Sequence, residues 1–218
     1  MKILALDAVT EACSAALWID GKVEERYAVA PREHTRLILP MVDELLQQAD
    51  LTPGNLDMIA FDRGPGSFTG IRVTMSVVQG LAFASGLPVL PVSSLAALAQ
   101  AAWRSHGAER VLGLIDARMG ELYWGEYHLH GEVMTLQGKE GVAPISNIPP
   151  CRECHIIGSG VSVYQDALRE AGYTQLIDEE RSRYPRAGYI AELAAGRSGE
   201  AMAVDEARPV YLRNKVTG

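Results

Sequence analysis

The glycine-rich segment from Gly64 to Gly70, GPGSFTG, has residue types and spacing that could bind an anion. It follows an apolar, strand-like run and precedes a predicted helix, so backbone amides and the positive end of the helix dipole would favour a phosphate there. Ile71 stands where a Walker loop requires lysine, which excludes a P-loop. Pro65 and Thr69 flank Ser67 where a nucleophile elbow needs glycines, which excludes that motif as well.

The same glycines also have a purely structural interpretation. A glycine lacks a Cβ atom and permits backbone contacts that other residues block. Gly64, Gly66 and Gly70 would then let a strand and a helix pack closely, and we favour this alternative over a phosphate cradle. We therefore assign these three glycines to a structural loop.

Two other motifs carry atoms that can bind metals. The segment Cys151 to His155, CRECH, has the spacing of a haem-attachment motif and contains half of a zinc site. Four zinc ligands would need a second close pair, which Cys13 alone cannot provide. His128 and His130 would share one face of a strand, but exposed polarity beside a turn is the simpler interpretation. No metal site is predicted, and neither cysteine of the CxxC pair receives a role.

The composition is that of an ordinary globular protein. With 218 residues, 48% hydrophobic and 22% charged, the chain can form one sizeable domain or two small ones. Its net charge of -7 repels a nucleic acid backbone, so any RNA would be held through a partner. No apolar run reaches the roughly 20 residues needed to span a bilayer, and no signal-peptide pattern is present. We expect a cytoplasmic protein that does not enter a membrane.

One pattern occurs twice along the chain. An apolar run ends in an acid at Asp7 and again at Asp116, and tight turns follow at Asp20-Gly21 and His130-Gly131. This repetition indicates two copies of a strand-hairpin-helix-strand-helix unit. We expect an α/β fold of two lobes, 1–105 and 106–218, each with a mixed central sheet and flanking helices.

Hydrophobic periodicity places the elements that would position these residues. Strands are predicted at 2–6, 12–19, 22–28, 57–61, 88–92, 110–115, 121–128, 132–136 and 156–157, helices at about 37–49, 68–85, 95–103, 162–171 and 186–195, and a loop over 138–150.

The predicted helix 68–85 is apolar nearly all round, and its only charge is Arg72. Such a helix is buried in a large core or covered by another molecule. Because the lobe is small, we favour cover by another molecule. Its candidate partner interface is a stripe of large apolar side chains: Leu45, Ile71, Met75 and Val78. The alternative is that half of them face the sheet, because periodicity does not say which face meets which neighbour.

The duplicated pattern resembles the actin, sugar-kinase and heat-shock ATPase superfamily (ASKHA, ribonuclease-H-like). The resemblance implies two hairpin loops that grip nucleotide phosphates, with Asp7, Thr10 and Asp116 as the contacting residues. Val9 and Arg118 bring side chains where glycine or another small residue serves best, so these phosphate loops are expected to be vestigial. The ordinary role expected for Arg118 is an ion pair with its neighbour Glu121.

Several segments together resemble one family, the bacterial TsaB (YeaZ) proteins of the tRNA threonylcarbamoyladenosine system. They are Ile3 to Thr10, Arg32 to Thr35 with Leu39-Pro40, Gly64 to Arg72, Ile115 to Arg118 with Glu121 and Tyr123, and Pro209 to Arg213. The resemblance implies a non-catalytic paralogue of the TsaD threonylcarbamoyltransferase. TsaD-like enzymes hold a metal with two histidines at helical spacing, whereas His34 is followed at those positions by Leu37 and Ile38. One imidazole is too few for a catalytic metal site.

The family resemblance also implies partners. These are a TsaD-type transferase, which the protein would stabilise as a scaffold, a TsaE-type ATPase, and a second copy of the chain, paired through the first two helices. No cofactor of its own is expected, and a nucleotide, ATP or ADP, is considered only at the complex with TsaD and TsaE. Two alternatives stay open: an actin-like ATPase or kinase that uses Asp7 and Asp116 around a nucleotide, and a homodimeric regulator unrelated to tRNA.

Overall fold

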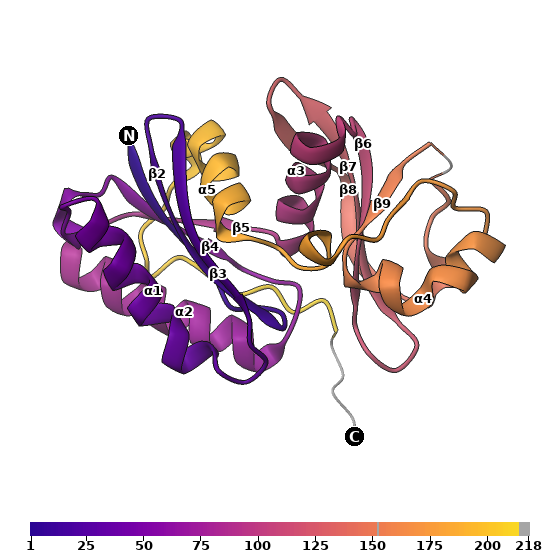
Figure 1. The fold of residues 1–218 in the computed structure, drawn as a ribbon, viewed down its shortest axis with the longest axis horizontal. Coiled ribbons are helices and arrows are strands. Elements are labelled where there is room, and N and C mark those ends of the chain that lie inside the picture. The colour runs from indigo at the N-terminus through magenta and orange to yellow at the C-terminus, as the bar shows by residue number, and fades with distance from the viewer. Residues whose placement is uncertain (152, 214–218) are drawn as a thin grey trace. The chain divides into compact units, whose positions relative to one another are not determined.

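The computed structural model describes residues 1–151 and 153–213, and these form two compact units (Figure 1). Of these residues, the first unit comprises Met1–Ser94 and Arg186–Val210, and the second comprises those of Leu95–Pro185 and Tyr211–Arg213. This division differs from the expected lobes 1–105 and 106–218. The difference arises because two helices pack on the sheet of the other half of the chain. The helix Ser94–His106 goes with the second unit, and the helix Ala187–Gly196 goes with the first.

The first unit is built on a five-stranded mixed sheet with the order β3-β2-β1-β4-β5. Its strands are β1 (Lys2–Asp7), β2 (Ala12–Ile19), β3 (Lys22–Val29), β4 (Met58–Asp62) and β5 (Val89–Val92). The first three form an antiparallel meander, and β4 and β5 continue it in parallel with β1. Apolar runs on β1 and β4 fit this central position, since both faces are covered.

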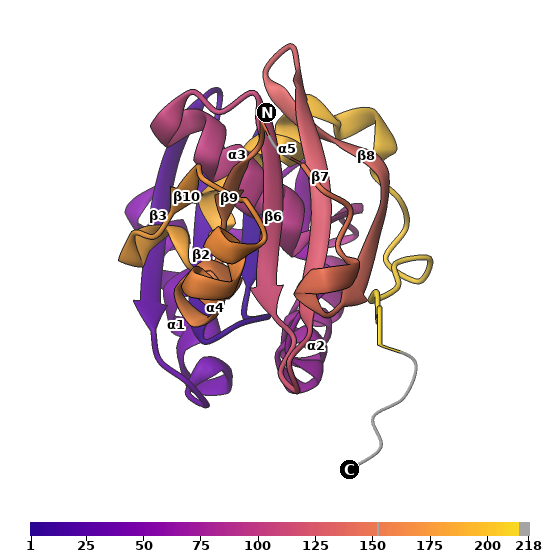
Figure 2. The same cartoon turned by 90° about the vertical axis from the view of Figure 1, so that its right-hand side faces the viewer.

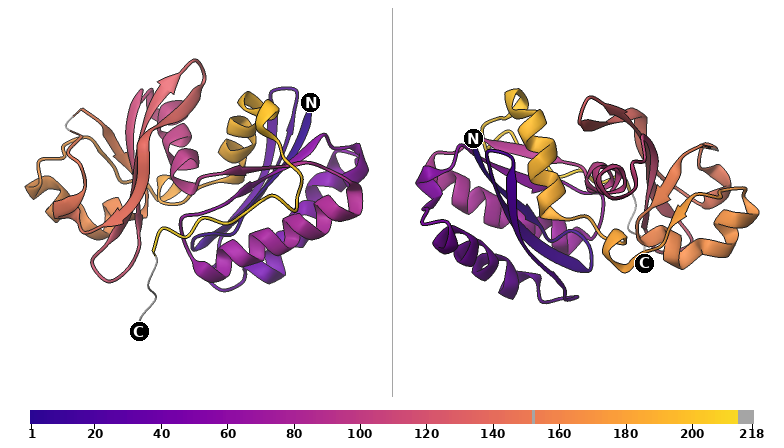
Figure 3. Two further views of the ribbon diagram at one scale, coloured as in Figure 1. Left: turned by 180° about the vertical axis from the view of Figure 1, so that it is seen from behind. Right: turned by 45° about the horizontal axis from the view of Figure 1, so that its top comes forward.

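Helices cover both faces of this sheet. Two of them, α1 (His34–Gln48) and α2 (Phe68–Ser85), lie side by side on one face, and α5 (Ala187–Gly196) covers the other (Figure 3). After α5 the chain returns along the same unit, where Met202 pairs with Val89 and the amide of Val210 donates to the Arg63 carbonyl at 2.9 Å.

The second unit repeats the arrangement, with the sheet order β10-β9-β6-β7-β8 (Figure 2). Its strands are β6 (Arg110–Asp116), β7 (Leu122–His130), β8 (Val133–Ala143), β9 (His155–Ile157) and β10 (Leu176–Ile177). The helices that accompany it are α4 (Ser159–Glu170) and α3 (Ser94–His106). Because β6 to β10 take the same places as β1 to β5, the duplicated actin-like, ribonuclease-H-like α/β fold is confirmed.

Most predicted elements are present, with one notable exception. Strand β8 continues to Ala143 and so takes up the first six residues of the expected loop. The left-handed backbone at Gly138 and a bulge in the register between Trp124 and Glu126 let this strand bend and keep its pairing with β7. Among the described helices, none combines the length and apolarity needed to cross a bilayer.

Side chains of the first sheet hold the amino end of α5. Glu25 on β3 accepts hydrogen bonds from the Arg186 guanidinium, at 2.9 Å from Nε, and from the Gly188 amide at 2.8 Å. Ser14 Oγ accepts from the Ala187 amide at 2.9 Å. Arg186 also lies 4.5 Å from the centre of the Tyr27 ring. These contacts satisfy amides that a helix leaves unpaired at its start, and they attach α5 to the sheet.

Replacement of Glu25 by alanine should therefore loosen α5. The Glu25 side chain is only 14% exposed and its bonds to Arg186 are charge-assisted, so we expect Glu25→Ala to lower the free energy of unfolding by about 2–3 kcal/mol. Urea denaturation followed by circular dichroism measures this. Glu24→Ala, one residue earlier on the exposed part of β3, is the control and should change stability by less than about 0.5 kcal/mol. Equal losses in the two variants would contradict the assignment.

Candidate functional site

The loop after β1 carries the predicted phosphate-contacting residues Asp7 and Thr10. Asp7 is completely buried, and its Oδ1 accepts a hydrogen bond from the Val9 amide at 2.9 Å. Thr10 Oγ1 accepts from the Ala12 amide at 3.3 Å. The Thr10 carbonyl lies 2.9 Å from Nε2 of His34. The loop is thus tied by its own side chains, and one ring nitrogen of His34 contacts its backbone.

The glycine-rich loop packs directly on this first loop. The Ser67 amide donates to the Val9 carbonyl at 2.7 Å. A Cβ atom at Gly66 would lie 2.5 Å from Val9 Cγ1, and one at Gly70 would lie 2.1 Å from the Ala8 carbonyl oxygen. Gly64 has a positive φ, and a Cβ atom there would lie 2.9 Å from Cδ1 of Ile71. At Gly66 and Gly70 the glycines face the protein's own backbone, which fits the structural interpretation.

A buried acid that the sequence interpretation missed lies beside Asp7. Asp62 ends β4, and the register that pairs Leu6 with Phe61 places it next to Asp7 on the neighbouring strand. Its Oδ1 accepts from the Gly64 amide at 2.8 Å and from Ser94 Oγ at 2.6 Å. The signal was available, since Asp62 ends an apolar run just as Asp7 and Asp116 do.

Asp7 and Asp62 form a coupled carboxyl pair. Burial raises the pKa of Asp7 well above its ordinary value, and the neighbouring Asp62 raises it further. Burial raises the pKa of Asp62 to about 6, although hydrogen bonds from Ser94 and Gly64 act to lower it. The Oδ2 atom of each acid is buried and receives no hydrogen bond from a described donor. A single proton shared between the two carboxyls satisfies both, because two ionised carboxylates cannot bond to each other.

The corresponding loop of the second unit is polar and more open. Asp116 Oδ1 accepts from the Arg118 amide at 2.9 Å, and Oδ2 lies 3.3 Å from the Arg118 guanidinium. The expected pairing of Arg118 with Glu121 is wrong, since Glu121 pairs with Arg213. Arg118, Met119 and Gly120 all have positive φ values, and this bends the chain so that Arg118 turns back to Asp116.

The four residues predicted for a partner interface lie in the core of the first unit. The exposed fractions of Leu45, Ile71, Met75 and Val78 are 1%, 1%, 7% and 0%, and all four belong to the cluster packed under the sheet. The prediction of an exposed stripe is therefore wrong. Residues three or four apart share a helix face, and here that face meets the sheet. A charged substitution at these positions would test folding rather than association.

The outward face of α2 is formed by other residues. Phe83 is 84% exposed and Phe68 is 50% exposed, with the Arg72 guanidinium 3.8 Å above the Phe68 ring. Small residues occupy exposed positions of the same helix: Ser76, Gly80 and Ala84. A pocket of about 410 Å³ opens beside them. Its lining residues come from α1 and α2: Thr35, Phe68, Thr69, Arg72, Val73, Ser76 and Val77. We call this surface the α2 outer face.

Comparison with known proteins identifies the family of the chain. A family model described as TsaD, tRNA N6-adenosine threonylcarbamoyltransferase, matches residues 28–215. A protein of Escherichia coli described as tRNA threonylcarbamoyladenosine biosynthesis protein TsaB is 41% identical, over 99% of this chain and 96% of its own. The chain belongs to the TsaB (YeaZ) family. A Haemophilus influenzae TsaB protein is 37% identical over 100% of this chain and 95% of its own.

A solved structure of the TsaB family has the same fold. YeaZ from Pseudomonas aeruginosa superposes with a TM-score of 0.86 at 44% identity, covering 97% of this chain and 99% of that chain. The fold and the sequence therefore agree on the family, and the buried acid pair and the α2 outer face are features of a TsaB-family chain.

The Asp7–Asp62 pair predicts an unusual pH dependence of stability. Both carboxyls hold a proton more tightly in the folded protein than in the unfolded chain, where the pKa is about 3.9. Their contribution is therefore fully present below pH ~4 and is lost as the pH rises through the folded values, about 6 for Asp62. In Asp7→Asn an amide hydrogen replaces the shared proton, so the free energy of unfolding should exceed wild type by on the order of 2 kcal/mol at pH 8.

Urea unfolding at a series of pH values between 4 and 8 checks this prediction. Asp116→Asn is the matched control, because it removes the corresponding acid of the other unit and leaves the buried pair intact. It should keep the wild-type pH profile. An identical decline from pH 4 to pH 8 in wild type and Asp7→Asn would show that the pair does not share a proton.

Proposed function

We propose that this chain is a non-catalytic scaffold subunit in the formation of threonylcarbamoyladenosine in tRNA. In this role it binds and stabilises a TsaD-type threonylcarbamoyltransferase in the cytoplasm, together with a TsaE-type ATPase. The observation that carries the proposal is the 41% identity, along nearly the whole of both chains, to a protein described as a tRNA threonylcarbamoyladenosine biosynthesis protein.

The absence of catalysis is supported by the loops of the first unit. Catalysis on a phosphate or a carbonyl needs polar groups that face the substrate. Here Asp7 is completely buried, and a nitrogen of His34 contacts the Thr10 carbonyl. Gly66 and Gly70 face Ala8 and Val9 instead of a ligand. Any ATP or ADP would in this proposal be bound at the complex with the TsaD-type and TsaE-type partners.

The α2 outer face is suited to the partner contact. Exposed large apolar side chains such as Phe83 are costly unless another molecule covers them. Exposed small residues at Ser76, Gly80 and Ala84 lie at intervals of four, in one row along the helix, where they allow a partner helix to approach closely. The occupant in this proposal is a helix of the TsaD-type transferase, and a second copy of this chain would use the same surface. The tRNA is bound through the complex, in keeping with the net charge of -7.

Replacement of Gly80 by arginine separates binding from folding. A Cβ at Gly80 meets nothing within 4 Å, and arginine is a better helix former than glycine, so the monomer should be unchanged or more stable by about 0.5–1 kcal/mol. On the α2 outer face the new side chain would hold a partner helix away. We expect at least about 100-fold weaker binding to the TsaD-type transferase in isothermal titration calorimetry, equivalent to about 2.7 kcal/mol.

Gly199→Arg is the matched control. Gly199 belongs to the same unit, has equally open space around its Cβ position and does not lie on α2. It should bind like wild type. Wild-type affinity in Gly80→Arg would remove the α2 outer face from the proposal, and the lack of any binding by wild type would remove the partner. ATP hydrolysis by the isolated chain at a rate typical of enzymes would instead favour the actin-like ATPase alternative.

A further inference from the structure

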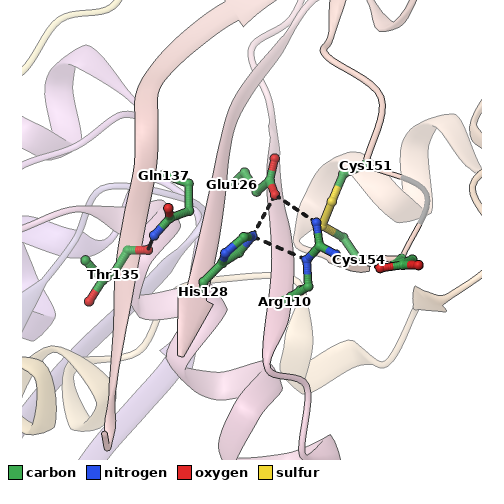
Figure 4. Close-up of polar contacts among 8 residues, drawn as sticks. Arg110, Glu126, His128, Thr135, Gln137, Cys151 and Cys154 are labelled. Atoms are coloured by element: carbon green, nitrogen blue, oxygen red, sulfur yellow. Dashed lines mark hydrogen bonds and ion pairs between the residues drawn. A yellow bond between two sulfur atoms is a disulfide. The ribbon is translucent and has the colours of Figure 1, made fainter. Parts of the chain in front are cut away.

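Metal-binding side chains from two separate sequence motifs meet on the second sheet (Figure 4). Glu126 and His128 lie two residues apart on β7 and so share one face of that strand. Cys151 and Cys154 lie in the segment that leads into β9. A carboxylate oxygen of Glu126 and both sulfur atoms lie within 4.8 Å of one another. His128 Nε2 is 2.7 Å from Glu126 Oε1.

The sheet topology explains why these motifs meet. Strand β6 lies between β7 and β9 and pairs with both. Arg110 on β6 is opposite His128 on β7, and the next residue, Val111, is opposite His155, which directly follows Cys154. Neither motif supplies enough ligands alone. Together they supply two sulfurs and one carboxylate, donors of the kind that zinc takes.

The charges around the cluster also suit a divalent cation. With both cysteines ionised, the two sulfurs and Glu126 carry three negative charges. The Arg110 guanidinium supplies one positive charge, at 3.7 Å from Glu126 and 2.6 Å from Glu153. A dication would reduce the combined charge of the two sulfurs, Glu126, Glu153 and Arg110 from -3 to -1. This reduction matters because the cysteines are nearly fully buried, at 4% and 2% exposed.

The sulfurs are joined as a disulfide in the structure, so metal binding and the disulfide exclude each other. A cysteine binds a metal as a thiolate, and the sulfurs of a disulfide are not thiolates. A disulfide-exchange role is less well supported, since reactive CxxC pairs are accessible and often begin a helix. Here both sulfurs are buried and the segment leads into strand β9. The half-exposed Glu126 and His128, at 27% and 30%, leave an approach for an ion.

We propose that the dithiol form of this cluster binds one thiophilic divalent cation of the zinc class through Cys151, Cys154 and Glu126, with a solvent molecule as the fourth ligand. Reduction by a phosphine opens the site. The S–S bond breaks, phosphorus takes the oxygen of a water molecule and becomes the phosphine oxide, and the two protons of that water go to the sulfurs. Binding of the cation then releases both thiol protons to solvent.

The test is a cobalt titration of the full chain after reduction with a phosphine in the absence of oxygen. We expect one Co²⁺ per chain, with a thiolate-to-cobalt charge-transfer band and the strong visible absorption of tetrahedral cobalt. Addition of Zn²⁺ should abolish both signals. The unreduced protein should show neither. The absence of a charge-transfer band in the reduced wild type would overturn the proposal.

Variants assign the ligands. Cys151→Ser should abolish the charge-transfer band, and Glu126→Gln, a partly exposed and nearly isosteric change, should weaken cobalt binding at least about tenfold. Cys13→Ala is the control, because this buried free cysteine belongs to the first unit. It should leave the spectrum unchanged. A wild-type spectrum in Cys151→Ser, or undiminished affinity in Glu126→Gln, would overturn the site as assigned. The result is independent of the proposed scaffold role, which uses the α2 outer face.

Discussion

The first unit depends on one close contact, between the backbone of Ala8 and Val9 and the start of α2. Gly66 and Gly70 are required there, because a Cβ at either position would overlap the β1–β2 loop at 2.5 Å or less. The contact brings α2 against the ends of β1 and β4 and excludes water from them. Asp7 and Asp62 are consequently both fully buried, and one proton has to serve two carboxyls. Packing and electrostatics at this site therefore have a single cause.

The same contact fixes how α2 is rotated about its axis. With Gly70 against the Ala8 carbonyl, the helix faces the sheet with Ile71, Met75 and Val78, which all belong to the buried cluster. The opposite side, with Ser76 and Phe83, must then face outward, whatever the hydrophobicity of its residues. A helix that is apolar on both sides can bury only one of these sides within its own unit. The restraint that closes the loop at Asp7 thus also presents the α2 outer face.

The sequence predicted the duplicated fold well, because repeated apolar runs and hairpin turns are local signals. It could not predict that α3 and α5 exchange sheets, since periodicity shows that a helix has an apolar face but not which sheet covers it. The interface residues were assigned to the wrong side of α2 for the same reason: an apolar residue such as Met75 looks alike in a core and at an interface. Asp62 could have been found from its pattern, whereas the approach of Glu126 to the CxxC pair depends on strand order.

The acids that end strands have a common structural role. Asp7, Asp62 and Asp116 each accept a hydrogen bond from the amide two residues later, at 2.9, 2.8 and 2.9 Å. This is the Asx turn, in which a carboxylate replaces a backbone carbonyl and turns the chain sharply. A strand that must end at a tight loop therefore favours an acid even where no nucleotide binds. In this chain the turn is retained in both units, while Val9 and Arg118 occupy the positions where a phosphate-binding loop needs a small residue. The repeated acids are thus explained by chain geometry, and a role for this protein in association is consistent with keeping them.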